Sequence, residues 1–489
     1  MSVTDLLDLD ATALAAALRT GDTSPTEVLD ATLDAAAQVG AAVGAFTVLA
    51  AEHARAQAST AEAALVAARR AGDVGRSPAT SPGALPPFLG VPCPVKDLTM
   101  VEGVPMRAGS AAIDAFLAPV DDGVVTLLRA AGTVMVGKTT TPELGLPCYT
   151  EPDVGPTART PWDLDRSAGG SSGGAAAAVA ARVVPVAHGS DGGGSLRIPA
   201  SACGLVGLKP SRGLVSPGPH GVDGAGLATH GVLTRSVRDT AAFLDVLARP
   251  WPGDTFTARL DAPPAGRPLR VGLLLDPVIS ADAPVHPDCS GAARATATLL
   301  EDLGHDVVEI PPPFGADRWD AFAALWSVGA LQAPVPADRE HLLVPLTRWL
   351  RERGRSATGL EHATALVEVQ RLTRDVAAAW EGLDVVLSPT LAQPPALVGT
   401  QRDDADPAAD FAAQTAFTPW TSVWNLTGRP AISLPLGEAQ VAGRGHTSRT
   451  VPVGVMLGAD HGQDALLLDL AARLEDAAPW ADRRPGPTP

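Results

Sequence analysis

Two serines in glycine-rich segments have the surroundings that nucleophilic catalysis requires. Ser195 follows three consecutive glycines, and Ser171 lies in the sequence Gly-Gly-Ser-Ser-Gly. A glycine backbone is bare on one side, so several N–H groups can converge on one oxygen and form an oxyanion hole beside a nucleophile. An ordinary glycine turn with a capping serine explains Ser195 about equally well, so this motif alone leaves both interpretations open.

The segment between the two serines can bring their hydroxyl groups together. An alanine-rich helix of about ten residues, roughly 15 Å long, leads away from Ser171, and a strand roughly 17–23 Å long returns to Ser195. A serine hydroxyl also needs a base to take its proton. The candidate is Lys96, at the end of an apolar stretch, where burial would lower its pKa and keep the amine neutral. A surface lysine with a buried stem is an equally good interpretation.

Two further glycine motifs match known patterns but lack the required context. Residues 132–139 satisfy the phosphate-loop pattern GxxxxGK[ST]. Their four middle residues favour a strand, however, and the Thr-Thr-Thr-Pro that follows Lys138 cannot easily begin a helix, so a strand ending at a glycine turn is preferred. Residues 169–173 match the nucleophile elbow GxSxG, but the polar residues 160–167 do not form the strand that an elbow needs.

The elements around these motifs predict an α/β fold. Residues 4–70 have the spacing and start signals of helices, and residues 72–87 form a loop rich in glycine, serine and proline. After residue 88, β-branched runs alternate with helical runs, which predicts a central twisted mixed sheet covered by helices on both faces. The predicted strands are 91–95, 133–136, 183–187, 269–275, 307–310, 384–387, 431–434 and 453–457, and the predicted helices are 123–131, 173–182, 289–303 and 463–474. Residues 311–355 are less regular and predict a lid or variable region.

The composition excludes several classes of partner. The chain has 489 residues and a formal net charge of −17, which disfavours binding to nucleic acid or to an anionic membrane. Four scattered cysteines suggest neither a disulfide framework nor a zinc site. Acidic residues near the N-terminus disfavour a signal peptide, and no apolar run reaches the ~18 residues of a membrane span. We therefore expect a cytoplasmic protein.

At this point the residues resemble a family, the amidase signature hydrolases. The segments that carry the resemblance are Lys96, residues 169–174, residues 191–200 and residues 203–210, with the family's spacing of 24 between Ser171 and Ser195. Further matching segments are 137–143, 236–239, 387–390 and 425–430. The sequence Ser-Asp-Gly-Gly-Gly-Ser at 190–195, with His188, is similar to the bacterial branch of 6-aminohexanoate cyclic-dimer hydrolases and urethane-cleaving amidases. Many family members have Thr-Asp-Thr where this chain has Ser-Asp-Gly.

The resemblance implies a role for each residue of the motifs. Ser195 would be the nucleophile, Ser171 a bridging serine preceded by a cis peptide bond, and Lys96 the base. Ser172 would form a hydrogen bond within the site, and Asp191 and Arg197 would form a buried pair. The backbone N–H groups that would hold the oxyanion are those of Gly192, Gly193, Gly194 and Ser195. No metal and no cofactor would be needed.

The resemblance also implies a domain organisation: an N-terminal helical flank, 1–70, precedes an amidase signature domain, 71–489. Within that domain we expect a core at 88–250, a variable substrate-side region at 250–425, and closing strands and a helix at 426–475. We expect a monomer or a homodimer.

The expected reaction is acyl transfer to Ser195 followed by hydrolysis of the acyl-enzyme. Aromatic residues cluster at 314–326 and 411–424, which indicates a bulky apolar amide, oligoamide, urethane (carbamate) or ester substrate, although ordinary core packing explains both clusters equally well. The candidate substrate contacts are Tyr149, Thr150, His220, Trp326, Phe417, Trp420 and Trp424. Two other functions compete: a glutaminase-type amidotransferase subunit, although Ile198 stands where those typically have glutamine, and a nucleotide-binding protein that uses residues 132–139.

Overall fold

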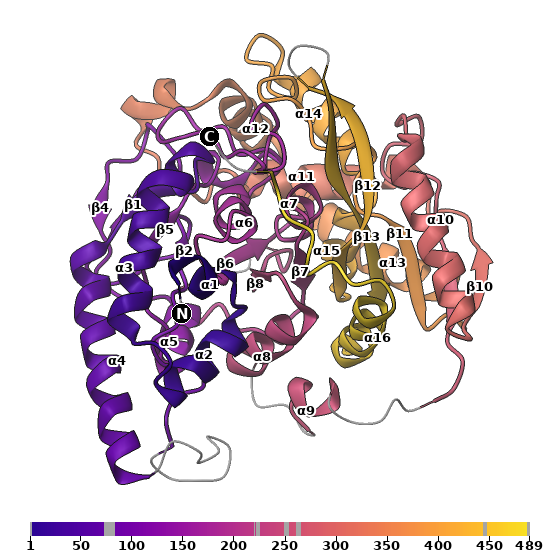
Figure 1. The fold of residues 1–489 in the computed structure, drawn as a ribbon. Helices are drawn as coiled ribbons and strands as arrows, with labels where there is room; N and C mark the ends of the chain where they lie inside the picture. Colours follow the sequence, from indigo (N-terminus) through magenta and orange to yellow (C-terminus); the bar gives the residue numbers. More distant parts are fainter. Residues whose placement is uncertain are drawn as a thin grey trace.

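A mixed sheet of eight strands forms the centre of the computed structural model, which describes residues 2–72, 84–219, 221, 225–248, 254–260, 266–443 and 447–486 (Figure 1). The strand order is β10-β9-β11-β13-β12-β7-β8-β6. The first three strands are parallel, and every other neighbouring pair is antiparallel. The bounds are β6 Val186–Asp191, β7 Val206–Lys209, β8 Thr229–Thr234, β9 Arg270–Leu273, β10 Asp306–Glu309, β11 Val385–Pro389, β12 Ala431–Ala442 and β13 Ser448–Ala459.

A smaller sheet of three strands continues this sheet beyond β6. Its order is β1 (Phe46–Leu49), β5 (Gly137–Thr139) and β2 (Val95–Lys96). The backbone N–H of His188 in β6 donates to the carbonyl of Pro94, just before β2, at 3.0 Å. The strand predicted at 133–136 is therefore displaced: the regular strand begins at Gly137, and Val134 forms only an isolated bridge with Pro92. Strands β3 (Pro105–Met106) and β4 (Phe116–Leu117) form a separate pair.

Helices cover both faces of the large sheet, as predicted. Alternate residues of β13 point to opposite faces. Val453 and Val455 belong to a core cluster with residues of α10 and α16, whereas Gly454 and Met456 contact Ser201 and Arg197 of α7. The N-terminal helices lie on one side of the molecule and α10 on the other (Figure 1).

The helices have the following bounds: α1 Val3–Asp8, α2 Ala11–Thr20, α3 Pro25–Ala35, α4 Ala51–Ala71, α5 Gly123–Ala130, α6 Gly173–Ala180, α7 Arg197–Cys203, α8 Val237–Leu247, α9 Phe256–Leu260, α10 Pro287–Asp302, α11 Asp320–Gly329, α12 Pro345–Ser356, α13 Gly359–Ala379, α14 Pro407–Phe417, α15 Ser422–Thr427 and α16 Asp464–Ala477. Short 3₁₀ or π turns occupy Ala36–Gly40, Glu143–Gly145, Ala316–Trp319 and Ala337–Leu342. Within the described ranges, no helix combines the length and the apolar character that crossing a membrane demands.

Two regions differ from the expectation. Residues 311–355 are not irregular, because α11, α12 and two 3₁₀ turns occupy most of the segment, and Ala330 at the end of α11 shares a core cluster with Leu346 and Leu350 of α12. The N-terminal segment is not purely helical, because β1 pairs with β5 and so forms the edge of the smaller sheet. The proposed division into a flank at 1–70 and a domain at 71–489 stays a prediction.

Candidate active site

Lys96 and Ser171 meet in the interior where β2 ends beside β6. The Lys96 Nζ donates to Ser171 Oγ at 2.7 Å and to Ser190 Oγ at 3.2 Å, and it lies 3.5 Å from the Ser190 carbonyl oxygen. Lys96 is fully buried, and the peptide bond between Gly170 and Ser171 is cis. Ser172 Oγ donates to the same Ser190 carbonyl at 3.2 Å. The Lys96 amine and the Ser172 hydroxyl therefore both contact the Ser190 carbonyl oxygen, while Ser171 contacts the amine itself.

The interior around Lys96 favours an uncharged amine. Burial lowers the pKa of Lys96 to about 7, an effect that the negative charge of Asp191 opposes. The Lys96 backbone N–H donates to His188 Nδ1 at 3.4 Å, and His188 Nε2 lies 3.1 Å from His230 Nδ1. Burial lowers the pKa of His188 well below its ordinary value and that of His230 to about 4, so both rings are neutral at pH 7. The sequence drew attention to His188 but assigned it no role, and nothing in it pointed to His230.

The glycine loop between β6 and α7 is anchored by Asp191. Its Oδ1 accepts the Gly194 N–H at 2.8 Å, and its Oδ2 accepts the Leu196 N–H at 3.2 Å. The N–H of Gly194 therefore points to the carboxylate, and the expectation that it would hold an oxyanion is corrected. The remaining candidates to donate a hydrogen bond to the oxyanion are the N–H groups of Gly192, Gly193 and Ser195.

Asp191 and Arg197 form the expected buried pair. Arg197 Nε donates to Asp191 Oδ2 at 3.0 Å and Nη2 to Oδ1 at 2.9 Å, and both side chains are fully buried. Burial raises the pKa of Asp191, but the Arg197 charge and hydrogen bonds from Arg197 and Asn425 outweigh burial and hold it at about 2.

Asn425, from α15, completes this anchor. Its amide donates to the Asp191 carboxylate and backbone carbonyl at 2.9 and 3.1 Å, and its Oδ1 accepts from Arg197 Nη2 at 2.8 Å. Thr421 adds a further tie, because its Oγ1 donates to the Gly193 carbonyl at 2.7 Å. Asn425 begins one of the matching segments, which was the only signal that the sequence offered for its importance.

Ser195 lies between two cavities. The larger, of about 350 Å³, is lined by Ser195, Ser171, Ser190 and Gly192 on the polar side and by leucines and Trp326 elsewhere, and the polar side chains of Gln332 and His362 also line it. The smaller, of about 60 Å³, is lined by Ser195, Gly193, Ile198 and aromatic rings that again include Trp326. Within the described part of the chain, neither lining contains an aspartate, glutamate, lysine or arginine. We call these cavities the large lobe and the small lobe.

Of the six expected substrate contacts that the structure describes, only Trp326 lies in a lobe wall. Tyr149 lies behind the small lobe, where its hydroxyl donates to Asp410 Oδ2 at 2.6 Å. Thr150 is fully buried and donates to the Gly169 carbonyl at 2.8 Å. His220 lies outside the described residues.

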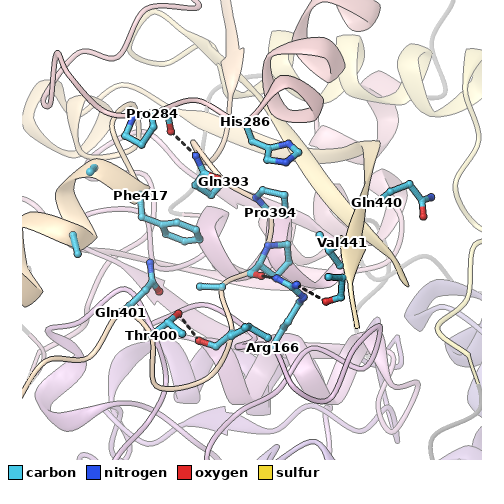
Figure 2. Close-up of a pocket in the computed structure, with 16 residues that line it drawn as sticks. Arg166, Pro284, His286, Gln393, Pro394, Thr400, Gln401, Phe417, Gln440 and Val441 are labelled. Carbon is cyan, nitrogen blue, oxygen red and sulfur yellow. Dashed lines mark hydrogen bonds between the residues drawn. The ribbon is translucent and has the colours of Figure 1, made fainter. Parts of the chain in front are cut away.

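The three aromatic candidates in residues 417–424, between the end of α14 and the middle of α15, also lie away from the lobes. Trp420 and Trp424 are core residues: the Trp420 indole N–H donates to the Asp276 carbonyl at 3.0 Å, and Trp424 stacks on Trp380. Phe417 lines a third cavity, of about 640 Å³, whose lining includes none of Lys96, Ser171 and Ser195. Figure 2 shows this cavity, with Phe417 and Gln401 on one side, His286 above and Arg166 below. The aromatic rings that do line the small lobe with Trp326 are Trp319, Phe322 and Phe411.

The phosphate-loop motif folds in a way that excludes nucleotide binding by that motif. Residues 137–139 form strand β5, and Lys138 is fully buried. Its Nζ lies 3.1 Å from Asp97 Oδ1 and donates to the Thr99 carbonyl at 2.7 Å. A phosphate loop requires a free backbone cradle and a lysine that reaches the ligand, and both are used here within the fold.

Comparison with known proteins agrees with this geometry. The family model described as Amidase matches residues 27–468. The 6-aminohexanoate-cyclic-dimer hydrolases of Paenarthrobacter ureafaciens and of Pseudomonas sp. strain NK87 are each 37% identical to this chain, and each alignment covers 99% of this chain and 98% of the relative. The structure of 6-aminohexanoate cyclic dimer hydrolase complexed with substrate superimposes with a TM-score of 0.86 at 34% identity, over 98% of this chain and 99% of that one. This chain therefore belongs to the amidase signature family and is an amide-cleaving hydrolase.

Proposed function

We propose that the protein hydrolyses uncharged, apolar amides through a triad of Ser195, Ser171 and Lys96. The observation that carries the proposal is the 2.7 Å contact between Lys96 Nζ and Ser171 Oγ in a fully buried setting, in which burial lowers the pKa of the amine to about 7. A neutral amine has a lone pair that can accept a proton, which an ordinary lysine lacks at pH 7.

In the first half of the reaction, Ser195 Oγ attacks the carbonyl carbon of the substrate. Its proton passes to Ser171 Oγ while the Ser171 proton passes to Lys96 Nζ. The carbonyl oxygen becomes an oxyanion that accepts hydrogen bonds from among the N–H groups of Gly192, Gly193 and Ser195. When the tetrahedral intermediate collapses, the C–N bond breaks, and the amine takes its proton from Ser171, which Lys96 reprotonates.

In the second half, water attacks the ester carbon of the acyl-enzyme. The same relay takes the proton of the water and returns one to Ser195 Oγ, which releases the acid. The proton that leaves with the amine is replaced by one from water, so the cycle returns Lys96 to its neutral form.

The lining of the two lobes supports uncharged substrates. In the described linings no aspartate, glutamate, lysine or arginine offers a countercharge, so a charged group would lose its hydration there at a cost of several kcal/mol. The relatives named above act on a cyclic dimer, which has amide bonds and no chain ends, in keeping with this lining. The same chemistry extends to urethanes and esters with apolar substituents. Glutamine, which bears an ammonium and a carboxylate at pH 7, fits this lining poorly, and that weighs against an amidotransferase role.

The test compares wild type with Ser195→Ala on an aryl anilide, an aliphatic amide, an aryl urethane, an aryl ester and glutamine. We expect wild type to cleave the uncharged compounds and the variant to cleave none of them above background. Intact-protein mass spectrometry after mixing with the ester should show one acyl adduct on wild type and none on the variant. Activity confined to glutamine, or activity that survives the substitution, would overturn the proposal.

A further inference from the structure

The reacting groups are divided unequally between the linings of the two lobes. Ser195 lines both, but Ser171 lines only the large lobe. The loop glycines are divided in the same way, because Gly192 lines the large lobe and Gly193 the small one. A carbonyl held by these two N–H groups beside Ser195 Oγ therefore lies at the junction, with one substituent in each lobe.

The position of Ser171 decides which substituent enters which lobe. In the function proposed above, the leaving nitrogen takes its proton from Ser171, so the nitrogen must lie within hydrogen-bond reach of that hydroxyl, about 2.6–3.2 Å. The nitrogen and the group that it bears therefore face the large lobe. The acyl substituent must point to the other side of the carbonyl carbon, into the small lobe.

We propose that the enzyme is selective for short acyl groups carried on bulky apolar amines, and that Trp326 enforces this division. The proposal rests on the function proposed above. The small lobe, about 60 Å³, is far smaller than the large lobe, about 350 Å³. A short acyl group therefore suits the first, and an aromatic or extended alkyl amine suits the second.

Trp326 is fixed as the wall between the lobes. An ideal Cβ placed on Gly192 would lie 3.3 Å from its ring, and one on Gly193 would lie 3.2 Å from Phe322, so the two rings close directly over the glycine loop. Trp319, Phe322 and Trp326 form a stack with centroid separations of 5.2 Å at each step. The Trp319 indole N–H donates to Ser422 Oγ at 2.8 Å, which anchors the far end of the stack.

Two isomeric amides test the assignment of the lobes. N-benzylacetamide has a small acyl group and a bulky amine, and N-methyl-2-phenylacetamide has the reverse, while both contain an aliphatic acyl group and an alkylamine leaving group. We expect wild type to show a kcat/KM at least about tenfold higher for N-benzylacetamide. An equal or higher value for N-methyl-2-phenylacetamide would overturn the proposal. If wild type cleaves neither isomer nor any uncharged compound of the earlier panel, the proposed function fails instead.

Substitution of Trp326 tests whether this side chain limits the size of the acyl group in the small lobe. Trp326→Ala should open the small lobe; Trp326→Leu replaces it if the alanine variant does not fold. The ratio of kcat/KM for N-benzylacetamide to kcat/KM for N-methyl-2-phenylacetamide should then move toward one, chiefly because kcat/KM for N-methyl-2-phenylacetamide rises. The matched control is Trp162→Leu, which removes a half-buried tryptophan whose indole N–H donates to the Cys203 carbonyl at 2.9 Å and which lines neither lobe. We expect this control to keep the wild-type ratio. An unchanged ratio in the Trp326 variants, or an equal change in the control, would contradict the role of Trp326.

Discussion

Two lysines on neighbouring parallel strands show how different partners give one buried amine a chemical role and the other a structural one. Lys96 ends β2, and Lys138 lies in the adjacent β5, where it pairs with Val95 across the sheet. Both side chains are fully buried, and burial lowers the pKa of both amines. Lys138 faces the carboxylate of Asp97 at 3.1 Å, whereas Lys96 faces the hydroxyl groups of Ser171 and Ser190.

The difference shows that burial alone does not make a lysine a base. A carboxylate in direct contact stabilises the ammonium form and holds it as one half of an ion pair. Hydroxyl groups accept from an ammonium and can also donate to a neutral amine, so they allow the proton to move in either direction. Lys96 has the second kind of surroundings, and the following changes would separate the two roles.

The largest effect is expected at Lys96. Lys96→Met should lower kcat by about 10⁴-fold, because Lys96 Nζ is the only hydrogen-bond partner of Ser171 Oγ among the described residues, and should leave the folded state largely intact. Lys96→Arg should not rescue activity, since a guanidinium stays charged. Steady-state kinetics and a thermal melt check both statements, and a Lys96→Met variant with near wild-type turnover would show that Lys96 is not the base.

Lys138 should show the opposite pattern. Lys138→Met leaves the Asp97 carboxylate buried without its cation, so we expect a loss of about 3–5 kcal/mol in the free energy of unfolding, while kcat of the folded enzyme stays near the wild-type value. Urea denaturation and active-site titration measure the two quantities separately. If kcat fell as far as in Lys96→Met, the distinction between the two lysines would be wrong.

Arg197 is a third buried cation that can be compared with the two lysines, and its partner Asn425 offers the test. Asn425→Leu removes the amide that donates to Asp191 and the oxygen that accepts from Arg197, so the loop that carries Gly193 loses part of its anchor. We expect a loss of about 1–3 kcal/mol in stability and about a tenfold fall in kcat. Gln440→Leu, at an exposed site on β12, is the control and should change stability by less than ~0.5 kcal/mol.

The smallest effect concerns pH. The pKa of Lys96 is about 7, so the active neutral form dominates above pH 7 and kcat/KM should rise with pH through that value. Ser190 Oγ accepts from the Lys96 amine and so stabilises its charged form. Ser190→Ala should therefore lower the pKa and move the inflection of the pH profile about 0.5–1 pH unit toward acid. An inflection that moves toward alkaline pH would contradict this assignment of the profile to Lys96.

Much of the fold and the candidate active site could be predicted because the signals are local. The helix start at Ser24 was readable because its hydroxyl accepts the Glu27 N–H in a capping box. The strand and helix between Ser171 and Ser195 follow from their composition, and the glycine loop from its three glycines. The large mixed sheet with helices on both faces is confirmed.

The contacts that were missed depend on long-range packing. Helix α11 is apolar on several sides because it packs against α12, α13 and the glycine loop, so it lacks the one-sided pattern that marks a surface helix. Asn425 reaches Asp191 from 234 residues away. The engagement of the Gly194 N–H by Asp191 depends on the path of the backbone, which residue types alone do not specify. Among the aromatic residues, composition could not distinguish the lobe wall at Trp326 from the core at Trp420 and Trp424.

The position of β12 and β13 in the middle of the large sheet has a consequence for biosynthesis. These strands are translated after the other six strands of the sheet, yet they pair with β7 on one side and β11 on the other. Until they emerge from the ribosome, β7 and β11 are open edges of two incomplete half-sheets, and open edges invite aggregation. A nascent chain that stalls before residue 431 would therefore be a substrate for chaperones, and a truncation that removes β13 would prevent the two halves from joining.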